Sequence, residues 1–184
     1  MREIKTVKKL RLITDAAILL ILLGLASAMP AGGGLWSGGL AGAAGAAGAA
    51  VNRAYYSGNP DKPYVSLMIN VYTGGEFIAP MMDVFDGYGV KATFFIGGSF
   101  AKNYPDIIRE IARRGHELAN HGYHHKDAAG LSYKTNFDEI IMAERQIEAI
   151  CGIKTKLFAP PSGSIGGEMF KAAEALGYRV IMWS

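Results

Sequence analysis

The strongest chemical feature of the sequence is a group of three histidines, His121, His124 and His125, within five residues. His121 and His125 are four residues apart, so on a helical turn their imidazoles would point the same way and could reach one metal ion. His124 would point elsewhere. The pair alone leaves two interpretations open, half of a metal site or a polar loop with surface histidines.

Other residues near this group have simpler expected roles. The segment HELAN lacks the second histidine of the H-E-x-x-H zinc motif, and His116 is expected to be a partly buried strand residue with its hydrogen bonds satisfied. Asp127 follows the histidines and could add a carboxylate to them. Cys151, the one cysteine, has no intrachain partner and is expected to act as a small buried apolar residue.

The histidines follow one of several short apolar segments that alternate with helical patterns. We expect strands at 65–71, 91–96, 116–120, 156–159 and 178–183, and helices at 76–88, 105–114, 135–151 and 168–176. This alternation predicts an α/β fold of parallel β/α units, whose active sites lie after the carboxyl ends of the strands. Five strands are too few to close a barrel of eight, so we expect a truncated part of a distorted (β/α) barrel.

Four segments, in order, resemble the polysaccharide deacetylases, the NodB-homology domains of carbohydrate esterase family 4. In the order of the chain they are VSLMINVY for the first motif T-F-D-D-G, GYGVKATFFIGG for the second strand, GHELANHGYHH for the second motif and LFAPPSG for the third motif R-x-P-[YF]-G. The resemblance covers about residues 64–184 and implies a distorted β/α barrel. MINVYTGGEF is also similar to a sporulation-associated branch with a degenerate first motif.

The resemblance implies a metal-dependent hydrolase, most often a zinc enzyme, in carbohydrate metabolism. Such enzymes remove N-acetyl groups from peptidoglycan or chitin-like polymers, or O-acetyl groups from xylan, with water activated by the metal. His121 and His125 match the metal-binding histidines of the second motif. The family's fourth and fifth motifs, which carry the general acid, would lie beyond Ser184.

Several of the matched positions depart from the family's pattern. Asn70 falls on the general base, Val71 on the carboxylate ligand of the metal and Ala159 on the arginine that holds the base. An amide takes no proton from water and an isopropyl group binds no cation. Tyr72 falls on the glycine of the first motif. The resemblance therefore implies that the metal is weakly bound or absent.

Pro160, Pro161 and Gly163 of the third motif remain. Pro160, Pro161, Gly163 and Tyr72 are implied to contact substrate, and the backbone N–H of Ser162 is implied to serve as an oxyanion donor. Two functions follow as hypotheses. The chain is a metal-dependent deacetylase of cell-envelope glycans, or it is a catalytically inactive relative that acts as a glycan-binding or structural envelope protein.

The first 28 residues are typical of an export signal. A basic segment ends at Arg11, an apolar stretch runs from Ala16 to Ala28, and Ala26-Ser27-Ala28 offers a cleavage site. The stretch is short for a spanning helix, which needs about 20 apolar residues, yet an uncleaved membrane anchor remains the alternative. We expect a secreted or membrane-tethered protein on the extracytoplasmic side.

The rest of the chain divides into a Gly/Ala-rich tether and linker at 29–63 and the deacetylase-like domain at 64–184. Five of the 19 basic residues and two of the 16 acidic residues lie in the first 28, which leaves 14 of each sign. This balance gives no basic face of the kind that nucleic-acid binding requires, so no nucleic-acid partner is expected.

Overall fold

The computed structural model describes residues 53–183, which form a single sheet covered by helices. The strands are β1 (Ala54–Tyr55), β2 (Met68–Val71), β3 (Thr93–Ile96), β4 (Glu117–Asn120), β5 (Leu157–Phe158) and β6 (Arg179–Ile181). The α-helices are α2 (Ile78–Gly87), α3 (Gly98–Asn103), α4 (Pro105–Arg113), α5 (Tyr133–Cys151) and α6 (Gly167–Ala175). Short 3-10 turns are η2 (Gly75–Phe77), η3 (Ala128–Gly130) and η4 (Pro161–Gly163).

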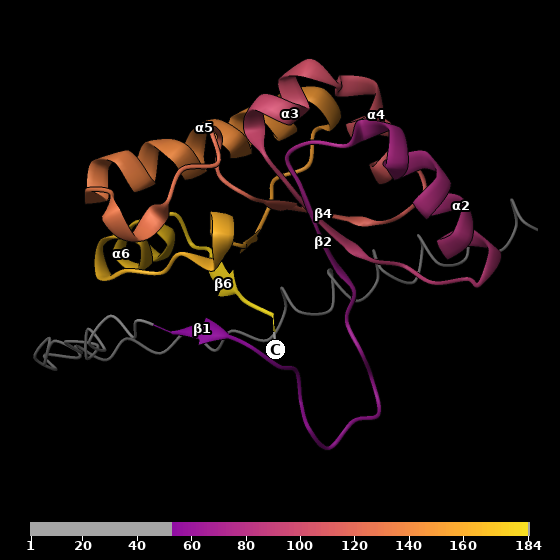
Figure 1. Ribbon diagram of the computed structural model, residues 1–184, viewed down its shortest axis with the longest axis horizontal. Coiled ribbons are helices and arrows are strands. Elements are labelled where there is room, and N and C mark those ends of the chain that lie inside the picture. Colours follow the sequence, from indigo (N-terminus) through magenta and orange to yellow (C-terminus); the bar gives the residue numbers. More distant parts are fainter. Residues whose placement is uncertain (1–52, 184) are drawn as a thin grey trace, which may run out of the picture. The chain divides into compact units, whose positions relative to one another are not determined.

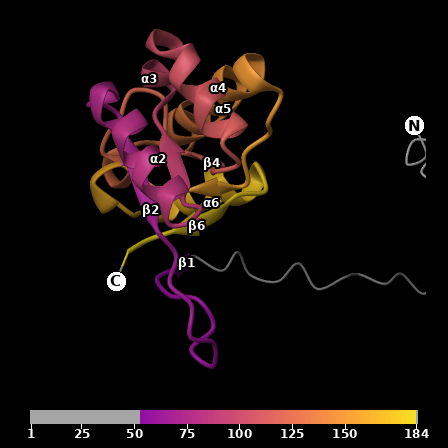
Figure 2. The same cartoon turned by 90° about the vertical axis from the view of Figure 1, so that its right-hand side faces the viewer.

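All six strands are parallel, in the order β1-β6-β5-β4-β3-β2. The expected α/β class and the half-barrel of parallel strands are confirmed. A sixth strand was not expected: β1, within the segment 29–63, pairs with β6 through Ala54 opposite Val180. Figures 1 and 2 show β1 beside β6, below the helices that cover the rest of the sheet.

Alternate residues of each strand face opposite sides of the sheet. One side carries the large core beneath α2, α4 and α5, which includes Phe94, Ile96 and Leu118. The other side carries a small cluster centred on Phe95, Ala119 and Ala159. Figure 1 shows α2 to α5 gathered on one side of the strands.

Several predicted boundaries were wrong for identifiable reasons. Strand β2 begins at Met68, not at 65, because Val65 and Leu67 are exposed. Helix α5 begins at Tyr133, two residues earlier than expected: Ser132 is its N-cap and accepts a hydrogen bond from the N–H of Thr135. Helix α3 was not expected, and Gly98 starts it almost directly after β3.

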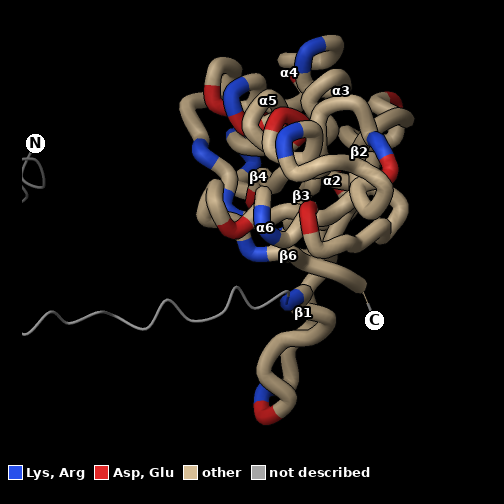
Figure 3. Tube along the Cα trace, turned by 90° about the vertical axis from the view of Figure 1, so that its left-hand side faces the viewer, with Lys and Arg blue, Asp and Glu red and all other residues tan. Residues whose placement is uncertain are grey.

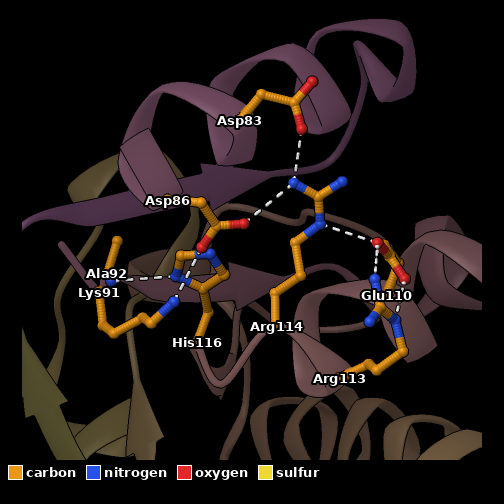
Figure 4. Close-up of polar contacts among 8 residues, drawn as sticks. All are labelled: Asp83, Asp86, Lys91, Ala92, Glu110, Arg113, Arg114 and His116. Atoms are coloured by element: carbon orange, nitrogen blue, oxygen red, sulfur yellow. Dashed lines mark hydrogen bonds and ion pairs between the residues drawn. The ribbon is translucent and has the colours of Figure 1, made fainter. Parts of the chain in front are cut away.

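The amino-terminal ends of β3 and β4 carry a network of ion pairs (Figure 4). Arg114, just after α4, lies 2.7 Å from Glu110 and reaches across to Asp83 and Asp86 of α2 at 2.6 and 3.1 Å. Asp83 and Asp86 are exposed and Arg114 and Glu110 are half-buried, so solvent screens the pairs and each contributes only modestly to stability. The network joins α4 to α2 at the end of the sheet away from the histidines.

His116 lies beside this network, and the expectation that its hydrogen bonds are satisfied was wrong. Its Nδ1 accepts a hydrogen bond from the N–H of Ala92 at 3.3 Å, but the buried Nε2 has no partner. The rings of Phe85 and Phe94 pack edge-on against the imidazole. His116 is therefore a buried neutral histidine in a mostly apolar setting.

Charged residues of both signs are interspersed along the described part of the chain, as Figure 3 shows. Among residues 53–183, no helix is both long and apolar enough to cross a membrane. The predicted export signal lies outside the described residues.

Candidate functional site

His121 directly follows β4, at the carboxyl end of the sheet, and its side chain is buried with 3% exposed. Its Nδ1 lies 2.8 Å from the carbonyl oxygen of Ala159, which directly follows β5. A carbonyl oxygen only accepts, so Nδ1 carries the proton and Nε2 keeps its lone pair. Burial lowers the pKa of His121 to about 4, against the opposing effect of the Ala159 hydrogen bond. His121 is thus a neutral imidazole suited to bind a metal.

His125 faces His121 with ring centroids 5.1 Å apart and planes at 70°. The spacing of His121 and His125 suggested a helical turn, but the segment between them is not helical. Gly122 and His125 both take left-handed conformations, with φ of 73° and 57°. The loop folds back on itself, and that fold brings the two rings together.

Tyr72, just beyond β2, packs against the ring of His125. Its ring centroid is 4.7 Å from that of His125, and its hydroxyl lies 3.4 Å from the carbonyl oxygen of His124. The ring also lies against Gly97, where an added Cβ would stand 2.7 Å from Cδ2 of Tyr72. Tyr72 therefore fills the space between Gly97 and His125.

Asn70 and Val71 point to opposite sides of β2. Val71 is 1% exposed and belongs to the apolar core with Ile78 and Met82. Asn70 is exposed and lies opposite Phe95 of β3 in the register, on the other side of the sheet. The position matched to the carboxylate ligand is therefore apolar, and the position matched to the base is a neutral amide.

Asp127 does not join the histidines. It accepts a hydrogen bond from the hydroxyl of Ser164, which in turn accepts from the N–H of Ala129. Within residues 53–183, no three His, Cys, Asp or Glu side chains lie close enough together to hold a metal ion. The donor chemistry of His121 and His125 fits a divalent cation such as zinc through two imidazoles, with no third side chain from the described residues.

The loop after β5 lies against the histidine loop, where Pro161 is near enough to Gly122 to contact an added Cβ at 3.5 Å. Ser162 is exposed with φ of 56°, and its N–H makes no hydrogen bond to the described residues. Gly163 lies under the ring of Trp183, whose Cη2 would be 2.7 Å from an added Cβ. Pro160, Pro161 and Gly163 thus shape the loop that presents the free N–H of Ser162.

One residue of this region was missed by sequence reasoning. Glu139 of α5 is buried, and its carboxylate accepts hydrogen bonds from the N–H groups of Tyr123 and His124 at 3.0 and 2.6 Å. The signal was present, since Glu139 precedes Ile140 on the core side of an amphipathic helix. A carboxylate there requires buried partners.

The family model for polysaccharide deacetylases matches residues 57–181. The uncharacterized protein YlxY of Bacillus subtilis is 38% identical over 129 residues, which are 70% of this chain and 40% of YlxY. A peptidoglycan-N-acetylglucosamine deacetylase of Bacillus cereus is 31% identical over 129 residues, 70% of this chain and 47% of that enzyme.

Solved structures include a pseudoenzyme of carbohydrate esterase family 4 from Bacillus anthracis. It is 35% identical, with a TM-score of 0.70 over 72% of this chain and 47% of that one. A mutant of the same pseudoenzyme, described as having restored enzymatic activity, also has a TM-score of 0.70, with 32% identity over 72% of this chain and 48% of that one. The chain spans 40% to 50% of the length of the curated relatives named YlxY, the B. cereus deacetylase and a B. subtilis N-acetylmuramic acid deacetylase.

Proposed function

Since the chain belongs to the polysaccharide deacetylase family, we propose that it is directed at the acetylated glycans of the cell envelope. Relatives with this domain are named as deacetylases of peptidoglycan and of chitooligosaccharides. The common substrate feature is an N-acetyl group on a polymeric sugar. Hydrolysis of that group requires a base for water, a cation or donors for the carbonyl oxygen, and an acid for the leaving amine.

We propose further that this chain binds such glycans without efficient hydrolysis. The observation that carries this proposal is the pair of Asn70 and Val71. The first is a neutral amide at the position of the base, and the second is an apolar side chain packed in the core. Loss of a positioned base lowers a rate about 100- to 10,000-fold. The solved relative described as a pseudoenzyme is consistent with this loss of activity in the family.

A working deacetylase is the second candidate, and the facing pair of His121 and His125 favours it. His121 presents an unprotonated Nε2, and the exposed N–H of Ser162 is free to donate to an oxyanion. A bound divalent cation would polarise the acetyl carbonyl and lower the pKa of water. Asn70 would only hydrogen bond to that water, because an amide accepts no proton.

Two assays on the full chain separate the candidates. Insoluble peptidoglycan is incubated with the protein, and the bound protein and the released acetate are both measured. We expect retention on the polymer with acetate no higher than in a protein-free control. Robust acetate release that a chelator abolishes would establish the enzyme and refute the binding proposal. Failure to bind peptidoglycan, chitin or acetylated xylan would refute both.

Zinc is proposed to bind weakly, through His121 and His125. Loss of an anionic ligand removes a direct Coulomb attraction to a divalent ion. His121→Ala should then remove most zinc binding seen by calorimetry, whereas His116→Ala, at the other end of the sheet, should keep it. Tight stoichiometric binding that survives His121→Ala would show that other residues hold the metal.

Export is proposed from residues 1–28, and relatives that act on peptidoglycan are consistent with an extracytoplasmic location. Expression in a bacterial host, followed by fractionation and N-terminal sequencing, tests this. A mature N-terminus after Ala28 supports cleavage, and an intact Met1 in the membrane fraction supports an anchor. An intact Met1 in the cytosol refutes export.

A further inference from the structure

Glu139 makes four polar contacts with the loop that carries the histidines. Its Oε2 accepts from the N–H of Tyr123 at 3.0 Å and of His124 at 2.6 Å. Its Oε1 lies 2.8 Å from Nδ1 of His124 and 3.1 Å from Nζ of Lys126. A single carboxylate on α5 thus binds Tyr123 and His124, which precede His125, and Lys126, which follows it.

These contacts outweigh the cost of placing a carboxylate in the interior. Glu139 is 7% exposed, and burial alone raises the pKa of a carboxyl group. The hydrogen bonds from His124, together with Lys126, nevertheless hold the pKa of Glu139 below its usual value. The carboxylate is therefore ionised while it binds the loop, and charge-assisted hydrogen bonds of this kind are about twice as strong as neutral ones.

The bound segment contains His125, one of two non-glycine residues with a left-handed backbone among the described residues. His125 has φ of 57°, a conformation that costs a non-glycine residue about 1–2 kcal/mol. Such a residue persists only where its surroundings determine it. Tyr72 packs on the His125 ring but does not hold the backbone N–H groups that precede it. Asn120 fixes the start of the loop through the N–H of Gly122 at 2.8 Å, and the N–H of Ser99 donates to the carbonyl oxygen of Tyr123 at 3.0 Å. Glu139 is the side chain that holds the N–H groups of Tyr123 and His124.

We propose that Glu139 is a positioning residue, which holds the loop in the shape that turns the His125 ring toward His121. Its relevance to metal binding rests on the proposed function of this histidine pair. Glu139 makes no hydrogen bond or ion pair with either ring of the pair within the described residues, and it acts through the backbone of Tyr123 and His124. Without the carboxylate, those two N–H groups lose their acceptor, and the strained conformation of His125 loses its support.

The test compares two glutamates of the same helix in the full chain. Glu139→Gln keeps the size of the side chain but removes the charge and one acceptor oxygen. Glu144→Gln is the matched control, because Glu144 is also buried in α5 and accepts from the hydroxyl of Tyr178 at 2.6 Å, a residue whose hydroxyl reaches the loop only through Asn120. Imidazole resonances from NMR, zinc titration and unfolding by urea are measured for the parent and both variants.

We expect Glu139→Gln to shift the ring resonances of His121 and His125 and to weaken zinc binding about 10- to 100-fold, as changes in residues behind metal ligands do. Glu144→Gln should lower the free energy of unfolding and leave the histidine resonances and the zinc affinity unchanged. Equal effects of the two variants, in proportion to their loss of stability, would overturn the proposal. So would unchanged histidine resonances in Glu139→Gln. If the parent binds no zinc, the metal proposal fails by itself, and the ring resonances still decide the role of Glu139.

Discussion

The Nδ1 atom of His121 lies 2.8 Å from the carbonyl oxygen of Ala159, so the ends of β4 and β5 are joined through one imidazole and the backbone. Any residue type at position 159 offers the same carbonyl. The absence of the family's arginine therefore leaves the orientation of His121 intact. A neutral amide at position 70 and an oriented His121 are therefore compatible in one structure.

Ala159→Arg is expected to destabilise this protein when made alone. Ala159 is fully buried beside Phe95 and Ala119, so a guanidinium there would lack a partner and cost about 3 kcal/mol or more. The resemblance assigns that arginine to hold a carboxylate at position 70. In the background of Asn70→Asp, the cost of Ala159→Arg should fall by about 1 kcal/mol or more. Urea unfolding of the two single variants and the double variant measures this coupling, and strict additivity would contradict it.

Val71→Asp is expected to lower the free energy of unfolding by about 3 kcal/mol, because it buries an unpaired carboxylate among apolar side chains. Asn70→Asp is the control, because its exposed side chain should change stability by no more than about 0.5 kcal/mol. If the new carboxylate turns toward His121 and His125 to complete a metal site, saturating zinc should recover part of the loss. Thermal melting with and without zinc shows whether it does. A zinc-independent loss would mean that the core, and not the missing ligand alone, prevents metal binding.

Gly97→Ala is expected to destabilise the protein by about 1–3 kcal/mol, because the added Cβ would lie 2.7 Å from the ring of Tyr72. In the background of Tyr72→Ala, the same change should cost much less. Gly87→Ala is a suitable control, since no other atom lies within 4 Å of its added Cβ. A cost at Gly97 that is independent of Tyr72 would place the constraint in the backbone instead.

Stability should fall with pH below about 6.5 in part because of His116. Burial lowers the pKa of His116, and the charge of Lys91 acts in the same direction. The folded state then binds fewer protons than the unfolded chain, so the contribution of His116 is complete above the unfolded pKa and is lost as pH falls toward the folded pKa.

His116→Gln keeps an acceptor for the N–H of Ala92 and removes the titration. Unfolding free energies at pH 7.5 and 5.5, about a unit either side of the unfolded pKa, should therefore differ less in this variant than in the parent. Identical pH dependence in the two proteins would argue that the buried ring does not contribute.

The sequence predicted the elements that local patterns determine. Apolar segments with β-branched residues indicated five of the six strands, and Pro105 and Gly152 correctly bounded their helices. Strand β1 was missed because two residues carry no pattern, and its pairing depends on β6, which lies more than a hundred residues further along the chain. Such distant pairing is a property of the folded chain alone.

The sequence was enough to predict which residue types form the site. It was less informative about how those residues are arranged. The spacing of His121 and His125 suggested a shared direction, but a left-handed His125 brings them together, and no local signal indicates that conformation. Alternation along β2 could have placed Asn70 and Val71 on opposite sides of the sheet. The contacts of Glu139 could not have been predicted, since they join α5 to a loop more than ten residues away.

The packing of Tyr72 on Gly97 has a consequence for the order in which this sequence can change. While Tyr72 is present, its ring disfavours any larger residue at position 97. A smaller residue at position 72 creates no such clash. A mutational path toward a more open histidine pair therefore begins at 72, and only afterwards does 97 become free to vary. A library that randomises position 97 first would be enriched in glycine, although the restriction comes from Tyr72.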